Sequence, residues 1–201
     1  MLRLWDLRQV TPASKAKKSP KKRAVQPAAT SAFDPTTVEG GRRARGLASI
    51  VSGTGPTSGL LFGLGVDSRV HTYAASTLLP LSPHGTFKHP NMNTNSFWVR
   101  LAISPDGRSI VSGSSAVIGK GASAFLFDVS QTAMAAPSIL PDITGVELHG
   151  QRGEVGGVDW AQDMLATCTD DGTVRVWRFD PETRQRCDSE ADDSMELDIG
   201  H

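Results

Sequence analysis

The sequence predicts an all-β fold: a partial β-propeller of about three blades plus one closing strand, with disordered linkers between them. Two observations predict it. Short apolar stretches, either β-branched or alternating with polar residues, are bounded by Gly or Asp, which is the pattern of strands and hairpins. The same order of stretches recurs along the 201 residues, and its period, after allowance for loops, is near the ~40–45 residues of a propeller blade.

The clearest copy of this repeat occupies residues 146–179. It opens with Leu148-His149-Gly150, continues through two apolar stretches, and then reaches the polar turn Asp170-Asp171-Gly172. A closing strand that contains Trp177 ends the copy. Because a Gly-containing turn between alternating stretches is a hairpin signal, we expect a complete blade here.

A second copy lies upstream, at residues 47–73. Its apolar stretches follow the same order, and Asp67 stands six positions before Tyr73, just as Asp171 stands six positions before Trp177. The shared spacing predicts that both aspartates lie in the turn before the closing strand of their blade.

A third copy lies between the other two, at residues 99–128. It contains the turn Ser104-Pro105-Asp106-Gly107 and ends in Phe125-Leu126-Phe127, and an insertion at 116–121 interrupts its hairpin. At the N-terminus, Leu2-Arg3-Leu4-Trp5-Asp6 is similar to a closing strand whose blade has no beginning in this sequence.

These copies divide the chain into four segments. A closing strand of an incomplete blade occupies 1–8, a basic linker rich in Pro, Ala and Lys occupies 9–45, the blades occupy 46–179, and an acidic tail occupies 180–201. The tail has little core-forming capacity, so we expect it to be disordered. Since propellers need about four to eight blades to close, we expect a shortened chain that lacks upstream blades.

The last copy resembles a WD repeat. In such repeats a His from the loop leading into the blade, a Ser or Thr, the turn Asp and the Trp form a chain of hydrogen bonds. The resemblance implies that this structural chain consists of His149, Thr169, Asp171 and Trp177, with Asp67 in the equivalent place of the upstream copy. Such partners would satisfy a buried Asp. We therefore prefer a structural role for His149 to a metal-binding or catalytic one.

The first closing strand carries a more specific motif, Trp5-Asp6-Leu7-Arg8. A WDxR ending resembles the signature of substrate receptors of cullin-4 ubiquitin ligases, where it faces the ligase adaptor, a damaged-DNA-binding protein built of propellers. The resemblance implies that Trp5, Asp6 and Arg8 bind this adaptor. A guanidinium two positions after the Asp can form forked hydrogen bonds to a partner. The alternative is that Arg8 is an ordinary solvated surface residue.

Longer stretches resemble blades of the denticleless family: residues 97–115, 153–160 and 165–171. Members of this family are cell-cycle substrate receptors of the cullin-4 RING ubiquitin ligase, and they recruit targets bound to the sliding clamp PCNA on chromatin. The resemblance implies a non-catalytic receptor that links target proteins to the ligase for ubiquitin-dependent degradation in DNA replication control. The alternative is a nuclear WD-repeat scaffold of chromatin assembly or RNA processing.

The linker carries a cluster of basic residues with three interpretations. It could be a nuclear-import signal, a nucleic-acid-binding arm, or a solvated loop. We prefer the first, which implies a nuclear protein, and do not expect direct nucleic-acid binding. The import candidates are Lys15, Lys17, Lys18, Lys21, Lys22 and Arg23.

The remaining features argue against other classes of protein. The 21 basic and 21 acidic residues leave a net charge of zero, so no whole-chain field attracts nucleic acid or anionic lipid. The two cysteines, Cys168 and Cys187, form no metal-binding pattern, and the common catalytic and nucleotide-binding motifs are absent. No apolar run approaches the ~18 residues of a membrane span. We therefore expect no enzymatic activity, no cofactor, no metal and no membrane partner.

Overall fold

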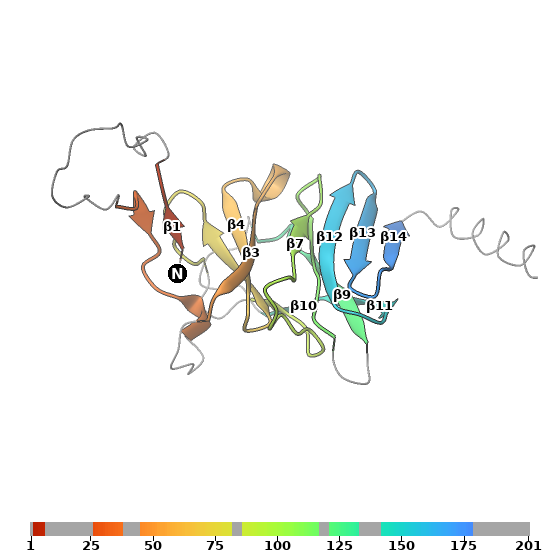
Figure 1. Ribbon diagram of the computed structural model, residues 1–201. Coiled ribbons are helices and arrows are strands. Elements are labelled where there is room, and N and C mark those ends of the chain that lie inside the picture. Colours follow the sequence, from red (N-terminus) through yellow and green to blue (C-terminus); the bar gives the residue numbers. More distant parts are fainter. Residues whose placement is uncertain are drawn as a thin grey trace, which may run out of the picture.

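The computed structural model describes residues 2–6, 26–37, 45–81, 86–116, 121–132 and 142–178. Within these ranges the regular structure consists of β-strands and short 3-10 turns, and the strands form four sheets. Figure 1 shows these sheets standing side by side along the molecule, in the order of the sequence. The all-β fold and the partial propeller predicted from the sequence are confirmed.

The first complete blade is a sheet whose strands run antiparallel in sequence order. Its strands are β3 (Leu47–Ser52), β4 (Leu60–Gly65), β5 (Arg69–Ala74) and β6 (Phe87–Lys88). A short strand, β10 (Ile143–Thr144), pairs in parallel with β6 and makes the sheet five-stranded. Strand β6 was not predicted from the sequence, because it is only two residues long.

The second blade is a four-stranded sheet in the order β11-β9-β8-β7. Its strands are β7 (Leu101–Ile103), β8 (Ser109–Ser112), β9 (Ala122–Asp128) and β11 (Val146–Gln151). The outermost strand, β11, contains the residues that the sequence assigns to the opening of the last repeat. That assignment is wrong, because β11 pairs antiparallel with β9 and so closes the second blade.

The third blade is a three-stranded antiparallel sheet. Its strands are β12 (Val155–Ala161), β13 (Met164–Thr169) and β14 (Val174–Arg178). Its innermost strand, β12, contacts β7, and β7 in turn contacts β3. The innermost strands of the three blades are therefore neighbours, as in a propeller, and Figure 1 shows this sequence of blades.

A small hairpin precedes the three blades. Strand β1 (Arg3–Leu4) pairs antiparallel with β2 (Ala29–Thr30), and the 3-10 turn η2 (Pro35–Thr37) follows. A strand is present within the predicted range 1–8, and that it closes a blade stays a prediction. The prediction of an unstructured linker at 9–45 needs correction for residues 26–37, because the backbone of β2 supplies the hydrogen-bond partners that β1 requires.

Successive residues of the second blade face opposite neighbours. On β8, Ile110 packs in a cluster shared with the first blade, whereas Val111 packs in a cluster shared with the third. On β9, Phe125 and Ala124 divide in the same way. This two-residue alternation is the geometry of a strand buried on both faces.

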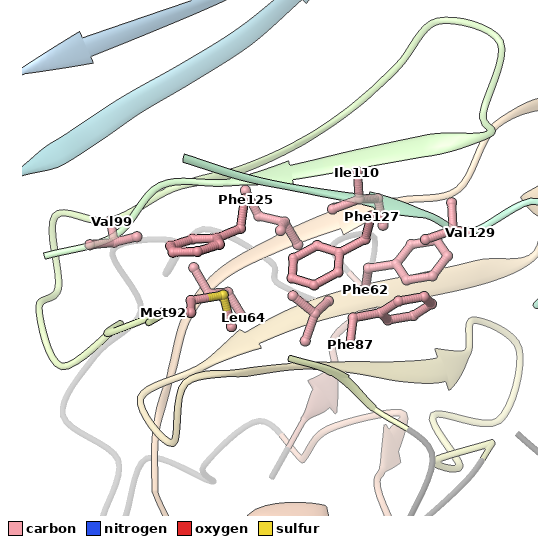
Figure 2. Packing of buried hydrophobic residues seen from close by; sticks show 11 residues of the cluster. Phe62, Leu64, Phe87, Met92, Val99, Ile110, Phe125, Phe127 and Val129 are labelled. Atoms are coloured by element: carbon pink, nitrogen blue, oxygen red, sulfur yellow. The ribbon is translucent and has the colours of Figure 1, made fainter. Parts of the chain in front are cut away.

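The cluster between the first and second blades is rich in aromatic rings, as Figure 2 shows. Phe87 of the first blade meets Phe127 of the second edge to face, with ring centroids 5.8 Å apart. The opposite side of the second blade, which faces the third blade, carries small residues. The third blade therefore packs closely against Ala102, Ala122 and Ala124. Side-chain size thus sets how each pair of blades fits together.

Candidate functional site

The N-terminal strand that carries the proposed adaptor motif is held in place at its first residues. The side chain of Leu2 is buried with Tyr73 and Leu78 of the first blade. The Leu2 amide donates to the Ser31 hydroxyl at 2.9 Å, and the Ser31 amide donates to the Leu2 carbonyl at 2.9 Å. These contacts fix β1 against the first blade.

The motif itself emerges from the end of β1. The side chain of Trp5 is 42% exposed, and Asp6 is half-buried. Arg8 lies outside the described residues, so the triad of Trp5, Asp6 and Arg8 stays a prediction. A large aromatic side chain that is partly exposed next to a fixed strand is suited to contact a partner protein.

The polar chain predicted for the last blade has a different membership. The indole of Trp177 donates to the Thr167 hydroxyl at 3.0 Å, and the Gln151 amide donates to the same oxygen at 2.8 Å. Thr167 and Gln151 are buried. This chain joins the outer strand of the second blade to two strands of the third.

His149 does not belong to this chain, and its predicted role is wrong. Its side chain is 76% exposed, and its Nδ1 lies 3.6 Å from the carboxylate of Glu147. The reason is an irregularity in β11: the register with β9 shifts between Leu148 and Gln151, and Gly150 has a φ of +107°. The bulge leaves His149 in solvent and returns Gln151 to the interior.

The other predicted members form a separate, more exposed group. The Thr169 hydroxyl donates to the carboxylate of Asp171, and Thr173 donates to it through its amide at 2.9 Å and its hydroxyl at 2.7 Å. The hydrogen bonds from Thr169 and Thr173 lower the pKa of Asp171 to about 2. Asp171 therefore stabilises its own turn, and within the described residues it makes no hydrogen bond to Trp177 or His149. The predicted four-residue chain is not formed, because Trp177 bonds Thr167 and His149 lies in solvent.

In the first blade, the turn aspartate contacts a buried histidine. Nε2 of His71 lies 2.9 Å from Oδ2 and 3.2 Å from Oδ1 of Asp67, and the His71 side chain is 3% exposed. Asp67 thus occupies the turn as predicted, but its partner, His71, comes from the closing strand. The alternation of β5 could have identified His71, because it shares a strand face with Tyr73, which is also buried.

Several other sequence-based assignments fall outside the described ranges. The proposed import residues, the acidic tail from 180 and most of the insertion at 116–121 are among them. Cys168 is a free, exposed thiol. Within the described ranges, no group of three or more His, Cys, Asp or Glu side chains could hold a metal ion, and no helix is long and apolar enough to cross a membrane. The candidate import residues in the undescribed part are Lys15, Lys17, Lys18, Lys21, Lys22 and Arg23.

Comparison with solved structures finds partial likenesses to WD-repeat proteins. The RRP9 WD40 repeats align with a TM-score of 0.49 at 17% identity, covering 68% of this chain and 36% of that chain. U3-55K gives a TM-score of 0.49 at 17% identity, covering 68% and 37%. At these scores the likeness adds nothing to the fold description, which rests on the sheets described above.

Comparison of sequences is more informative, although no protein-family model matches. Denticleless protein homolog A of Xenopus laevis is 32% identical over 199 residues, covering 97% of this chain and 24% of that protein. Cell division cycle protein cdt2 of Schizosaccharomyces pombe is 30% identical over 177 residues, covering 88% and 31%. The human denticleless homologue is 28% identical over 184 residues, covering 89% and 21%. This chain, which spans about a quarter of the length of such relatives, therefore belongs to the denticleless family of WD-repeat proteins.

Proposed function

We propose that this chain is a non-catalytic substrate receptor, which links target proteins to a cullin-4 ubiquitin ligase for ubiquitin-dependent degradation. The observation that carries the proposal is the similarity to denticleless proteins and to a protein named for cell division cycle control, which extends over most of the chain. The proposed setting is the nucleus, in control of DNA replication and the cell cycle. Targets presented on PCNA are part of the same proposal.

The proposed contact with the ligase adaptor is the motif Trp5-Asp6-Leu7-Arg8. Its support in the structure is the fixed position of β1 beside the first blade and the exposure of Trp5. A partly exposed indole supplies a large contact area at a small entropic cost, and an arginine three positions later can form forked hydrogen bonds to adaptor carboxylates or carbonyls.

The blades would position a target protein and would not catalyse ubiquitin transfer themselves. Their aromatic and aliphatic interfaces, buried on both sides of the second blade, make a rigid support for loops that hold a target. Holding a target near the ubiquitin-loaded carrier raises the effective concentration of its lysines. Bond formation would then be performed by other subunits of the ligase.

The experiment is co-purification of the tagged full-length chain with the cullin-4 adaptor, comparing wild type with Arg8→Ala. We expect the variant to lose at least nine-tenths of the recovered adaptor. Arg152→Ala is the matched control, because Arg152 is an exposed arginine of the loop between β11 and β12, far along the chain from the motif. Circular dichroism should show that all three proteins retain the same β-sheet content.

Two outcomes would contradict the proposal. Full adaptor recovery with Arg8→Ala would show that the motif does not bind the adaptor. Failure of the wild-type chain to recover the adaptor, together with recovery of chromatin-assembly or RNA-processing proteins, would favour a different nuclear scaffold.

A further inference from the structure

A small polar cavity lies at the edge of the second blade. Its volume is about 230 Å³. It forms where the segment that precedes β7 meets the end of β8, the start of β9 and the strand β11. Its polar lining consists of Asn91, Asn93, Ser114, Ser115, Ser123 and Glu147.

The charged group of this cavity is the carboxylate of Glu147, whose side chain is only 14% exposed. The side-chain amide of Asn91 donates to Glu147 Oε2 at 2.8 Å, and the Ser123 side chain is a second hydrogen-bond donor. Burial alone would raise the pKa of Glu147, but these two hydrogen bonds, with smaller contributions from His149 and His89, outweigh burial and hold the pKa below its usual value. The carboxylate is therefore ionised at neutral pH.

No permanent cation of the described part of the chain pairs with this carboxylate. The nearest basic groups are two histidines, which carry charge only when protonated: His149 Nδ1 at 3.6 Å and His89 Nδ1 at 3.9 Å. The Nδ1 atom of His89 also accepts a hydrogen bond from the backbone amide of Asn91 at 3.2 Å. An ionised carboxylate that has no permanent cationic partner can pair with a cation that enters the cavity.

Other residues of the cavity offer further hydrogen-bond acceptors on a backbone that is held by hydrogen bonds. The Oγ of Ser115 is buried and has no hydrogen-bond partner among the described residues. The backbone beside it is held firmly, because the Ser115 amide donates to the Asn93 carbonyl at 2.7 Å and the Asn93 amide donates to the Ser114 hydroxyl at 2.9 Å. A buried, unpartnered hydroxyl is available to accept a hydrogen bond from a ligand.

The size of the cavity limits the ligand. Its volume is below the roughly 300–1,000 Å³ of pockets for drug-sized molecules. It suits one long side chain that carries several N–H donors and a positive charge. Lysine and arginine have this combination of a slender apolar stem and a cationic end.

We propose that this cavity is a binding site for the cationic side chain of a lysine or arginine from a partner protein. Glu147 pairs with the charge, and Ser115 accepts one of the remaining N–H donors. The site goes beyond the proposed ligase role, because its described lining comes from the second blade and the segment before it and does not include Trp5. Its test therefore requires no adaptor.

The test is an NMR titration of the isotopically labelled full-length chain with N-acetyl-arginine methylamide and N-acetyl-lysine methylamide. We expect saturable shifts of the amides of Asn91, Asn93, Ser115 and Ser123 with at least one of the two. The uncharged analogue N-acetyl-citrulline methylamide should produce no saturable shift, although it has nearly the shape of arginine. In 0.5 M salt the wild-type affinity should fall several-fold, which needs no variant to observe.

Two variants complete the test. Glu147→Gln keeps the shape of the side chain and should raise the dissociation constant at least tenfold. Glu154→Gln is the matched control, because Glu154 lies outside the cavity and accepts a hydrogen bond from Ser96 at 2.7 Å; its dissociation constant should stay within twofold of wild type. Equal binding by Glu147→Gln, equal binding of citrulline, or shifts scattered over surface carboxylates would overturn the proposal.

Discussion

The first and last blades use equivalent turn aspartates in different ways. Asp67 of the first blade contacts a buried histidine, His71, so that the turn is tied to the interior. Asp171 of the last blade is exposed and accepts hydrogen bonds mainly from Thr169 and Thr173 of its own turn, with a smaller contribution from the Gly153 backbone. Equal spacing from the closing aromatic residue therefore predicts where the aspartate lies, but not what it stabilises.

The two blades also differ in how completely their faces are covered. In the first blade, Phe62 is fully buried against the second blade, while Tyr73 on the opposite side is buried with Leu2. In the last blade, Val174 and Val176 of β14 are 63% and 59% exposed. A blade needs a neighbour on each face to bury both sets of alternating residues.

The largest difference is expected for the apolar faces. Phe62→Ala should lower the free energy of unfolding by about 3–5 kcal/mol, because it leaves a cavity beside Phe87, whose ring centroid lies 6.3 Å away. Val176→Ala should change it by less than about 0.5 kcal/mol, because the side chain is mostly in water already. Urea unfolding of both variants measures the two values. Similar losses of unfolding free energy in the two variants would contradict the exposure of Val176 and show that this face of the last blade is buried.

An intermediate difference is expected for the two turns. Asp67→Ala leaves the buried Nε2 of His71 without its partner, so the free energy of unfolding should fall by about 1–3 kcal/mol. Asp171→Ala should cost less, since water can replace the carboxylate at its exposed threonine partners. Urea unfolding at one pH compares them. A larger loss for Asp171→Ala would refute the distinction between a buried and an exposed anchor.

The smallest effect on the free energy of unfolding is expected when the pH is lowered and Asp171 becomes protonated. Hydrogen bonds from Thr169 and Thr173 lower the pKa of Asp171 from its ordinary 3.8 to about 2 in the folded chain. Because the folded-state pKa is the lower one, ionised Asp171 favours folding above a pH of about 4, and this contribution disappears as the pH falls toward 2. Between these limits, wild type should lose stability slightly more steeply than Asp171→Asn in acid unfolding curves. Parallel curves would contradict the shift.

The sequence was sufficient for the repeated strands and turns because their pattern is local. The alternation that places Ile110 and Val111 on opposite faces, and the polar turn at Asp171, depend only on neighbouring residues. The partners across strands could not be predicted in the same way. A bulge at Gly150 leaves His149 in solvent and places Gln151 in the interior. Its presence depends on the pairing of β11 with β9.

The two proposed sites also differ in how far they can be predicted from the sequence. The motif at Trp5 is evident in the sequence, whereas the cavity around Glu147 brings together residues from four separate parts of the chain. Thr167 could have been identified from its strand face, which it shares with the buried Leu165, but Gln151 could not.

The attachment of the last blade through Gln151, Thr167 and Trp177 is tested most directly by hydrogen exchange of the Trp177 indole N–H, measured by NMR. In wild type this proton should exchange slowly, since it is donated to Thr167 at 3.0 Å. Thr167→Val should accelerate the exchange at least tenfold, and His149→Ala should leave it unchanged. Rapid exchange in His149→Ala, with no change in Thr167→Val, would instead place His149 in the chain and contradict the attachment described here.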